Sequence, residues 1–336
     1  MPAASGTPPS VMARVLLLGG AGFVGYHLAE RLSREGDDVT IVDDLSRGRM
    51  DSGLESLLAR PTVRFVRADL TVPGALAELP RAWDQVYLLA AVVGVRNTMS
   101  DPARVIRINT LATVNVLDWL TPDAGVIFFS STSEAYAGGV ARGLVPVPTP
   151  EDVPLSIDDI SHPRFAYAAS KILGEAAVLH YAKAKGVAVV VGRFHNVYGP
   201  RMGMDHVIPE LCLRALARED PFRVFGPEQR RAFCHIADAL EAITRLMVTE
   251  GARGQIVNVG NDTDETRVSD LLALILRIAK FAPTLAPAAA PSGSVARRCP
   301  DLKKLRALTG FAPKVSLEHG VRETFDWYRA WHEARR

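Results

Sequence analysis

The stretch that decides the fold is Gly19-Gly20-Ala21-Gly22-Phe23-Val24-Gly25. A short apolar run, Arg14–Leu18, precedes it, and Phe23–Glu35 follows with the spacing of an amphipathic helix. A second apolar run, Asp38–Val42, completes a β-turn-α-β unit of about 30 residues, the length that such a unit requires. Glycine permits a tight turn, a close approach of phosphate to the backbone, and close packing of the helix on the strand. The stretch therefore predicts a dinucleotide-binding turn at a helix N-terminus, with a glycine-rich turn that binds nothing as the alternative.

An acidic pair, Asp43 and Asp44, ends the second apolar run. Asp43 lies 18 residues after Gly25, close to the roughly 20-residue spacing at which a carboxylate binds the ribose hydroxyls of a dinucleotide. A carboxylate in that place repels a 2′-phosphate, so NAD is the expected cofactor rather than NADP. Arg47, which lies nearby in the sequence, weakens the preference for NAD, because an arginine can accommodate the 2′-phosphate of NADP.

Apolar runs and helical patterns continue to alternate along the chain, which indicates a parallel sheet covered on both faces. We therefore predict an α/β fold, a Rossmann doubly wound parallel sheet with a smaller C-terminal α/β substrate-binding domain. The expected further strands are Val63–Val66, Gln85–Leu89, Val126–Phe129, Val187–Val191 and Gln255–Val259, and the expected further helices are Pro102–Leu120, Ala166–Lys185, Asp205–Arg218, Phe233–Thr249, Val268–Lys280 and Val315–Ala330.

The regular alternation of strands and helices gives way to a more irregular pattern after Arg193, which suggests where the two domains divide. The NAD-binding domain is expected at residues 12–195, completed by about 231–262, and the nucleotide-sugar-binding domain at 196–230 and 263–333. Pro- and Gly-rich segments are expected to form loops at Ala137–Pro163, over the site, and at Ala282–Ser294. Residues 1–11 are small and Pro-rich, which predicts a flexible tail rather than a signal peptide.

Composition excludes several classes of function. The 336 residues include 39 basic and 37 acidic side chains with no basic run, so we expect no nucleic-acid partner. No apolar run approaches the roughly 20 residues that a membrane helix needs, so no membrane partner is expected. The cysteines, Cys212, Cys234 and Cys299, are far apart and lack metal-ligand spacing. They are expected to be reduced thiols of a cytoplasmic protein, with no metal site.

Tyr167 and Lys171 form a Y-x-x-x-K pattern on a predicted helix, where the i,i+4 spacing puts both side chains on one face. A Lys ammonium beside a phenol lowers the phenol's pKa, which would let Tyr167 remove a hydroxyl proton near neutral pH. Hydroxyl residues Ser130–Ser133 follow a predicted strand, whose carboxyl end is where ligands lie in such sheets. The alternatives are a chance Tyr–Lys pair and a Ser/Thr turn that caps the next helix.

These motifs together resemble the extended short-chain dehydrogenase/reductase family, in its nucleotide-sugar epimerase/dehydratase branch. The resemblance runs from about Arg14 to Trp327. It is carried by GGAGFVG (19–25), VDDLSRG (42–48), ADL (68–70), LLAA (88–91), INTLATVNVL (108–117), SSTSEAY (130–136), YAASK (167–171), RFHNVYGPR (193–201), RAFCHIAD (231–238), NVGN (258–261) and RRCPDLKK (297–304).

The resemblance implies roles residue by residue. It implies a catalytic triad of Thr132, Tyr167 and Lys171, assisted by Ser133 and Glu134. It implies that NAD is held by Gly19, Gly22, Phe23, Val24, Gly25, Asp43, Asp44, Ser46, Arg47, Asp69, Leu70, Leu89, Ala90, Ala91, Asn109, Ser130, Tyr167 and Lys171, with Asn109 bonding backbone near the site. It implies that the nucleotide-diphosphate sugar is bound by Gly94, Ser133, Glu134, Asn196, Arg201, Val207, Arg231 and Arg298.

His195 stands where the family usually has an apolar or aromatic residue. We expect it to be a buried, hydrogen-bonded histidine, with a substrate contact as the alternative. The resemblance also suggests a homodimer that pairs the helices Pro102–Leu120 and Ala166–Lys185.

The branches of the family share oxidation at sugar C4 and differ in the step that follows. Thr132-Ser133-Glu134 has a Ser where 4,6-dehydratases have an Asp acid, which disfavours dehydration. UDP-glucuronate decarboxylases carry Thr-Ser-Glu, whereas 4-epimerases usually carry Thr/Ser-Ser-Ser/Ala. A narrower resemblance, through SSTSEAYAG, PTPEDVPL, SHPRFAYAASK and NVYGPRMGMDHVIPEL, is to a bacterial subgroup that acts on activated sugars, some longer than hexoses, for surface polysaccharides or antibiotics.

The sequence thus predicts an NAD-dependent nucleotide-sugar 4-epimerase that acts through a transient 4-keto sugar. The alternatives are a UDP-glucuronate-type decarboxylase and a 4,6-dehydratase or 4-oxidase. A non-enzymatic NAD-sensing scaffold is a further alternative, which the intact Thr132, Tyr167 and Lys171 disfavour.

Overall fold

A seven-stranded sheet runs through the centre of the computed structural model, which describes residues 12–335. All neighbouring strands of this sheet pair in parallel, in the order β11-β6-β5-β4-β1-β2-β3. The predicted doubly wound Rossmann sheet is therefore confirmed, while the tail predicted at residues 1–11 lies outside the described residues. The strands are β1 (Arg14–Leu18), β2 (Asp38–Asp43), β3 (Val63–Arg67), β4 (Gln85–Leu88), β5 (Val126–Thr132), β6 (Ala188–Phe194) and β11 (Gln255–Val259).

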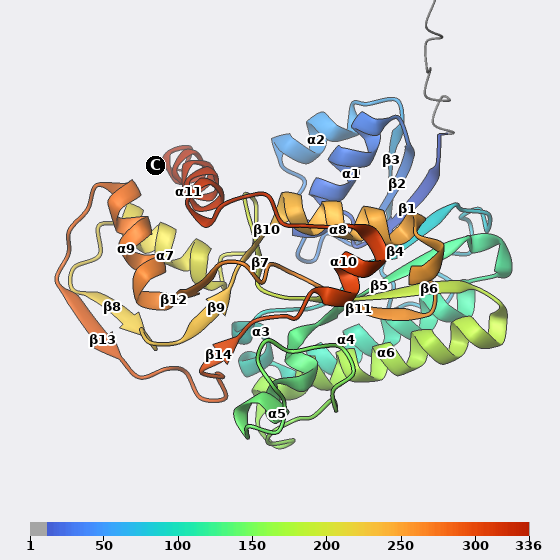
Figure 1. The fold of residues 1–336 in the computed structure, drawn as a ribbon. Coiled ribbons are helices and arrows are strands. Elements are labelled where there is room, and N and C mark those ends of the chain that lie inside the picture. Colours follow the sequence, from blue (N-terminus) through green and yellow to red (C-terminus); the bar gives the residue numbers. More distant parts are fainter. Residues whose placement is uncertain (1–11, 336) are drawn as a thin grey trace, which may run out of the picture.

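Helices cover both faces of the sheet, as Figure 1 shows. One hydrophobic cluster packs α1, α2, α8 and α10 on one face, and another packs α4 and α6 on the opposite face. Because both faces are covered, the central strands are mostly apolar rather than alternating, whereas the edge strand β3 carries Arg64 and Arg67. These helices are α1 (Phe23–Glu35), α2 (Ser52–Leu58), α4 (Pro102–Trp119), α6 (Ala166–Lys185), α8 (Ile236–Val248) and α10 (Lys303–Thr309).

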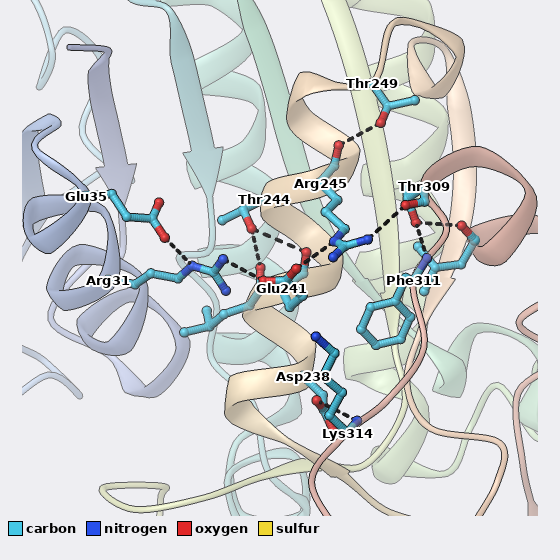
Figure 2. A network of polar contacts seen from close by, with 12 residues as sticks. Arg31, Glu35, Asp238, Glu241, Thr244, Arg245, Thr249, Thr309, Phe311 and Lys314 are labelled. Atoms are coloured by element: carbon cyan, nitrogen blue, oxygen red, sulfur yellow. Dashed lines mark hydrogen bonds and ion pairs between the residues drawn. The ribbon is translucent and has the colours of Figure 1, made fainter. Parts of the chain in front are cut away.

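Helix α8 forms hydrogen bonds with α1 on one side and with residues 309–315 on the other (Figure 2). Glu241 on α8 accepts hydrogen bonds from Arg31 of α1 and from Arg245 one turn on, both at 2.6 Å. Arg245 in turn donates to the carbonyl of Thr309 at the end of α10, at 3.1 Å. Asp238 accepts the backbone N–H groups of residues 314 and 315, each at 3.0 Å. These contacts hold the segment after β11 against the cofactor half of the molecule.

A second group of elements lies beside the sheet and encloses its own hydrophobic cluster (Figure 1). Three helices form its frame, α7 (Val207–Leu216), α9 (Val268–Ala279) and α11 (Leu317–Glu333). Its strands are short and pair over long sequence separations. They are β7 (Val197–Tyr198), β8 (Phe222–Phe225), β9 (Arg230–Ala232), β10 (Cys234–His235), β12 (Glu265–Arg267), β13 (Leu285–Ala288) and β14 (Arg297–Arg298).

Several predicted elements differ from those observed. Strand β5 extends three residues beyond Phe129, because Ser130–Thr132 continue the pairing with β6. Helix α8 begins at Ile236 rather than Phe233, because Cys234–His235 pair with β7 and the His235 ring accepts from the N–H of Ala237 as a cap. The predicted loop Ala282–Ser294 contains β13, and Ala137–Pro163 contains α5 (Ala137–Ala141). Short elements that were not predicted also include α2, α3 (Val95–Ser100), α10 and the 3-10 turns η1 (Pro122–Ala124), η2 (Ser133–Tyr136), η3 (Pro163–Phe165) and η4 (Glu250–Ala252).

Within residues 12–335, every helix is too short or too polar to cross a lipid bilayer. The same part of the chain gathers no group of three or more His, Cys, Asp or Glu side chains that could hold a metal ion.

Candidate active site

Three glycines of the turn after β1 serve different needs. Gly19 has φ +87°, and a Cβ there would lie 2.5 Å from the backbone nitrogen of Ala90. A Cβ on Gly25 would lie 2.5 Å from the Cα of Gly20, so the start of α1 could not pack on the turn. Gly22 is different, because its nearest neighbour would be the Gly19 carbonyl oxygen at 3.4 Å and its open side lines a cavity. The protein's own packing does not require glycine at this position, whereas close approach of a ligand does.

The cavity at this turn has a volume of about 760 Å³, which is within the range of pockets that hold cofactor-sized ligands. It begins at the glycine turn, passes the carboxyl ends of β2 and β4, and reaches Tyr167 and Lys171 on α6. Most of the residues predicted to hold NAD line it, which fits a dinucleotide lying across the carboxyl edge of the sheet. These are Gly19, Gly22, Phe23, Val24, Gly25, Asp43, Asp44, Ser46, Arg47, Asp69, Leu70, Leu89, Ala90, Ala91, Ser130, Tyr167 and Lys171.

The acidic end of β2 is anchored to the glycine turn. Asp43 accepts hydrogen bonds from the N–H of Ala21 at 3.0 Å and from the N–H of Leu45 at 2.8 Å. Burial raises the pKa of Asp43, and these two backbone donors oppose the rise. Arg47 extends away from this carboxylate and donates to the carbonyl of Ala91 at 3.4 Å. The Arg47 guanidinium, which the sequence offered as a reason to consider NADP, therefore lies near the segment that follows β4.

Asn109 supports the cavity wall from behind. Its side chain accepts from the N–H of Val92 at 2.7 Å and donates to the carbonyl of the same residue at 3.1 Å. A further bond joins Asn109 to Ser170 of α6 at 3.1 Å. Asn109 is buried and is not among the cavity-lining residues, so it acts on backbone near the site, as expected.

The three predicted catalytic side chains come together at one end of the cavity. Thr132 ends β5, and Tyr167 and Lys171 lie one turn apart on α6. Lys171 donates to the carbonyl of Ser130 at 2.6 Å, and its ammonium lies 4.7 Å from the centre of the Phe129 ring. Burial lowers the pKa of Lys171 to about 7.

The expectation that Lys171 lowers the pKa of Tyr167 is not met in this structure. Burial raises the pKa of Tyr167, and the groups that oppose the rise are the Thr132 hydroxyl, as a hydrogen-bond partner, and the charge of Arg47. The Lys171 ammonium lies 6.0 Å from the centre of the Tyr167 ring, and its short hydrogen bond is made to backbone instead.

An arginine cluster surrounds Glu134, two residues beyond Thr132. Arg298 donates to the Glu134 carboxylate at 2.8 Å, and a nitrogen of Arg164 lies 3.9 Å from the same oxygen. Burial by itself would raise the pKa of Glu134, but the charges of Arg298 and Arg164 outweigh it and lower the pKa. Glu134 is therefore ionised in a site where positive charge is in excess.

The structure distributes the other predicted substrate residues over the neighbouring segments. Asn196 has φ +43° and donates to the carbonyl of Ala232 at 3.0 Å. Val207 begins α7, and Gly94 immediately precedes α3. Ser133 is buried at the start of η2. Arg231 donates to the carbonyl of residue 295 at 2.7 Å and to the side chains of residues 229 and 294.

Arg201 lies elsewhere than its predicted substrate role suggests. Its guanidinium contacts the cofactor-side segments at Ala21 and Asp51 rather than the arginine cluster. His195 is fully buried, as expected, with Nε2 2.6 Å from the Tyr136 hydroxyl and 3.2 Å from the Asn258 side-chain oxygen.

Sequence reasoning missed several residues of the site. Arg164 lies in the Pro163–Phe165 turn just before the YAASK helix, and its closeness to that motif was the available signal. Other missed residues also line the cavity. Phe194, Met202, Met204, Asp205 and His206 lie within the quoted family segments but received no role. No motif marks the remaining ones, Arg96, Asn97, Trp327, Trp331 and Arg335.

Comparisons of this chain with a family model and with known proteins agree on one family. The model of the NAD dependent epimerase/dehydratase family matches residues 15–260. The chain is 33% identical over 325 residues to UDP-N-acetyl-alpha-D-glucosaminuronate decarboxylase of Bacillus cytotoxicus, covering 94% of this chain and 98% of that protein. It is 31% identical to UDP-glucuronic acid decarboxylase 1 of Xenopus tropicalis, covering 94% of this chain and 72% of that protein.

Among solved structures, the Thermus thermophilus UDP-glucose 4-epimerase in complex with NAD is similar to this chain. The TM-score is 0.79 with 28% identity, and the match covers 94% of this chain and 99% of that one. A family match over most of the chain, a glycine turn open to a cofactor-sized cavity, and the Thr132, Tyr167 and Lys171 site agree with one another. The chain therefore belongs to the NAD dependent epimerase/dehydratase family, whose cofactor is NAD.

Proposed function

We propose that this enzyme decarboxylates a nucleotide-diphosphate uronic acid after oxidation of the sugar at C4. The observation that carries the proposal is the excess positive charge at Glu134, where Arg298 and Arg164 face a single carboxylate. Glu134 is only two residues from Thr132, so this charge belongs to the end of the site where C4 reacts. A uronic acid places its own carboxylate on C5, beside that carbon. An arginine-rich site is chemically suited to such an anion.

The position of Arg231, the third arginine near Glu134, supports different roles for the three arginines. Arg231 donates its hydrogen bonds to the segment Ser294–Ala296 and to Gln229, and its charge acts on Glu134 without a direct contact. It is suited to the diphosphate, whereas Arg298 and Arg164 are suited to the sugar carboxylate. Arg298 contacts Glu134 through Nη1, and no hydrogen bond from its other nitrogens to residues 12–335 is observed, so they remain for a ligand.

The chain's own residues account for the proton transfers. NAD, when bound in the cavity, supplies oxidation of C4 to a ketone and the reverse reduction. Tyr167 would accept the proton of the C4 hydroxyl, with the Thr132 hydroxyl fixing the geometry, and would return that proton at the end. Lys171 donates to the Ser130 carbonyl and lies 6.0 Å from the centre of the Tyr167 ring, so it positions the end of β5 beside Tyr167.

A ketone at C4 makes the uronic acid a β-keto acid. The electron pair of the C5–C6 bond can then move toward the C4 oxygen as CO2 departs, and a proton from solvent replaces the lost carbon at C5. Glu134 is ionised and paired with Arg298, so it orients that arginine and does not serve as the acid.

The family relatives support this alternative over the 4-epimerase that the sequence predicts, because the two curated relatives above are both decarboxylases of UDP-uronic acids. The 4-epimerase stays as the second candidate. It is supported by the structural likeness to UDP-glucose 4-epimerase. The two reactions share the C4 ketone and diverge only in whether C5–C6 breaks.

The test is to incubate the enzyme with UDP-glucuronic acid, with UDP-N-acetylglucosaminuronic acid and with the corresponding neutral UDP-hexoses in D2O. We expect CO2 release from the uronic acids alone, with solvent deuterium at C5 of the product. Tyr167→Phe is the matched control and should lower turnover by about 10²- to 10⁴-fold, the usual contribution of a positioned acid–base group. A product of unchanged carbon content with inverted C4 and no deuterium would establish the epimerase instead.

We also propose the domain division and the dimer suggested by the sequence. Residues 196–230 and 263–333 would form the nucleotide-sugar-binding domain beside the NAD-binding sheet. Helices α4 and α6 would pair with those of a second copy. Ile106, Leu173 and Tyr181 are large apolar residues that these helices leave exposed, at 46%, 50% and 38%. Sedimentation equilibrium of the wild type and of Leu173→Glu tests the pairing, and an unchanged mass for the variant would argue against it.

A further inference from the structure

We propose that Arg201 is a positioning residue for the NAD-binding turn rather than a substrate ligand. It belongs to the segment between β7 and α7, which leads into the substrate side of the molecule. Its guanidinium, however, contacts the glycine turn and the loop before α2. One side chain therefore links three segments that are far apart in sequence, and it does so at the wall of the cofactor cavity.

The contacts of Arg201 occupy most of its donors. Nε and Nη2 bind the two oxygens of Asp51 at 3.0 and 2.9 Å, so the ion pair is bidentate. Nη2 also donates to the carbonyl of Arg49 at 3.0 Å, and Nη1 donates to the carbonyl of Ala21 at 3.1 Å. The guanidinium stacks 4.1 Å from the centre of the Tyr26 ring on α1. The side chain is only 9% exposed.

The Ala21 peptide region is consequently held from two sides. Asp43 accepts its N–H at 3.0 Å, and Arg201 binds its carbonyl oxygen at 3.1 Å. A turn that contains Gly19, Gly20 and Gly22 has wide backbone freedom, and ordering it for a ligand costs conformational entropy. Fixing Ala21 orders the turn in advance, so that the N–H groups at the start of α1 face the cavity before NAD arrives.

Asp51 extends the same restraint to the adjacent loop. Besides pairing with Arg201, it caps α2 by accepting the N–H of Leu54 at 3.0 Å. Burial would raise the pKa of Asp51, but the hydrogen bonds from Arg201 and Leu54 lower it below the ordinary value. The loop that carries Ser46 and Arg47 into the cavity is thus fixed at its far end.

The backbone at Arg201 supports a specific role for this side chain. Arg201 has φ +63°, a left-handed conformation that is unfavourable for a residue with a Cβ. The preceding carbonyl, that of Pro200, lies 2.9 Å from the His27 ring nitrogen on α1. A planar guanidinium is needed to bind Asp51 with two nitrogens while stacking on Tyr26, and an ammonium cannot reproduce this arrangement.

The experiment measures NAD binding directly, without turnover. The variants are Arg201→Gln and Arg201→Lys, and Arg214→Gln is the matched control. Arg214 is also bidentate, to Glu219 at 2.8 and 2.7 Å, and also stacks on an aromatic ring, Phe222 at 4.3 Å, but it lies on α7 away from the cavity. Readouts are the NAD retained after gel filtration and the rate of NAD release, followed by nucleotide fluorescence.

We expect Arg201→Gln to weaken NAD binding by about 10- to 100-fold, as expected for the loss of charge-assisted hydrogen bonds. Arg201→Lys should recover little of this loss, and Arg214→Gln should bind NAD like the wild type. Asp51→Asn should weaken NAD binding in the same direction by a smaller factor. The proposal is overturned if Arg201→Gln binds NAD normally and instead raises the KM for the nucleotide sugar. It is equally overturned if Arg214→Gln loses NAD to the same extent.

Discussion

Two arginine–glutamate groups near the catalytic helix differ in charge balance. Arg193 of β6 binds Glu175 of α6 through two nitrogens at 2.9 and 2.8 Å, with both side chains at most 3% exposed. In the other group the partly buried Glu134 faces Arg298 and Arg164, with Arg231 near enough to lower the pKa of Glu134 further. The first group is a balanced pair, whereas the second has one negative charge for three positive ones.

The balanced pair, Arg193 and Glu175, is suited to a structural role, whereas the unbalanced group at Glu134 is suited to binding. Arg193 and Glu175 satisfy each other, and their remaining capacity is used by the carbonyl of Glu151 and the hydroxyl of Ser131, at 2.9 and 2.5 Å. Charges removed from water need such full compensation. The group at Glu134 lacks such compensation within residues 12–335, and an anionic ligand would supply the missing negative charge. Four variants test this difference in charge balance, described below from the largest expected effect to the smallest.

Breaking the balanced pair should mainly cost stability. Glu175→Gln leaves the Arg193 guanidinium buried and unpaired, which costs about 3–5 kcal/mol of unfolding free energy. Urea unfolding followed by circular dichroism measures this loss. The control is Glu241→Gln, which breaks two more exposed ion pairs, with Arg31 and Arg245, and should cost about 1 kcal/mol for each pair or less. Equal losses in the two variants would mean that burial does not distinguish the pairs.

Breaking the unbalanced group should mainly cost activity. Arg298→Gln removes the leading charge that lowers the pKa of Glu134, so the burial effect gains weight and the pKa rises. We expect kcat/KM for the uronic acid to fall by about 10- to 100-fold, the usual value of a hydrogen bond to a charged group. Stability should change less than in Glu175→Gln, because one arginine fewer relieves repulsion.

The ionised form of Glu134 contributes stability above its ordinary pKa, and this is lost as the pH falls through the lowered pKa. In Arg298→Gln the pKa of Glu134 shifts upward toward that of the unfolded chain, so stability should decline less than in the wild type as the pH falls. Unfolding curves between pH 4 and 7 measure the shift. The same pH dependence in both proteins would contradict the assignment of Arg298 as the partner of Glu134.

His195 lies between the two groups and should produce a pH-dependent loss of stability. Burial lowers the pKa of His195 to about 3, whereas an unfolded chain would titrate near its ordinary value of 6.5. As the pH falls below 6.5, the unfolded state takes up the proton first, so stability declines. The slope contributed by one such group is about 1.4 kcal/mol per pH unit. His195→Gln should unfold with a slope shallower by this amount, and equal slopes would refute the buried neutral His195.

The smallest effect is expected at Arg164, whose nitrogen lies 3.9 Å from Glu134. Arg164→Gln removes an interaction that is longer than a hydrogen bond, so kcat/KM for a uronic acid should fall only a few-fold, in line with a pair worth up to about 1 kcal/mol. Activity against uronic acids and neutral sugars should be compared. A loss as large as that of Arg298→Gln would mean that Arg164 contributes as much as Arg298 to binding the sugar carboxylate.

Local patterns in the sequence predicted the parts of the fold that local physics determines. Helix α6 was predicted with its observed bounds, Ala166–Lys185, because a long apolar and Ala-rich segment ends at a glycine with left-handed conformation. Strand β11 was also predicted with its observed bounds. The strand–turn–helix at residues 14–35 matched because its glycine spacing reflects a steric need.

Contacts between remote segments could not be predicted in the same way. Strands β8 and β13 are four residues each and pair across about sixty intervening positions, so neither has a pattern strong enough alone. The residues Glu134, Arg298 and Arg231 were identified through family motifs, but the motifs did not reveal that Arg298 pairs with Glu134. Arg201 was predicted to bind substrate, but its contacts with Ala21 and Asp51 could not be predicted, because they depend on how the two halves meet.

The position of β11 at the edge of the sheet bears on how the protein is made. A ribosome delivers Ala188–Phe194 well before Gln255–Val259, so the nascent sheet ends for some time in an unpaired apolar strand. Such an edge is a template for pairing with other chains. We expect synthesis to depend on chaperones over this interval. A fragment that stops at residue 195 should aggregate rather than yield a free NAD-binding half.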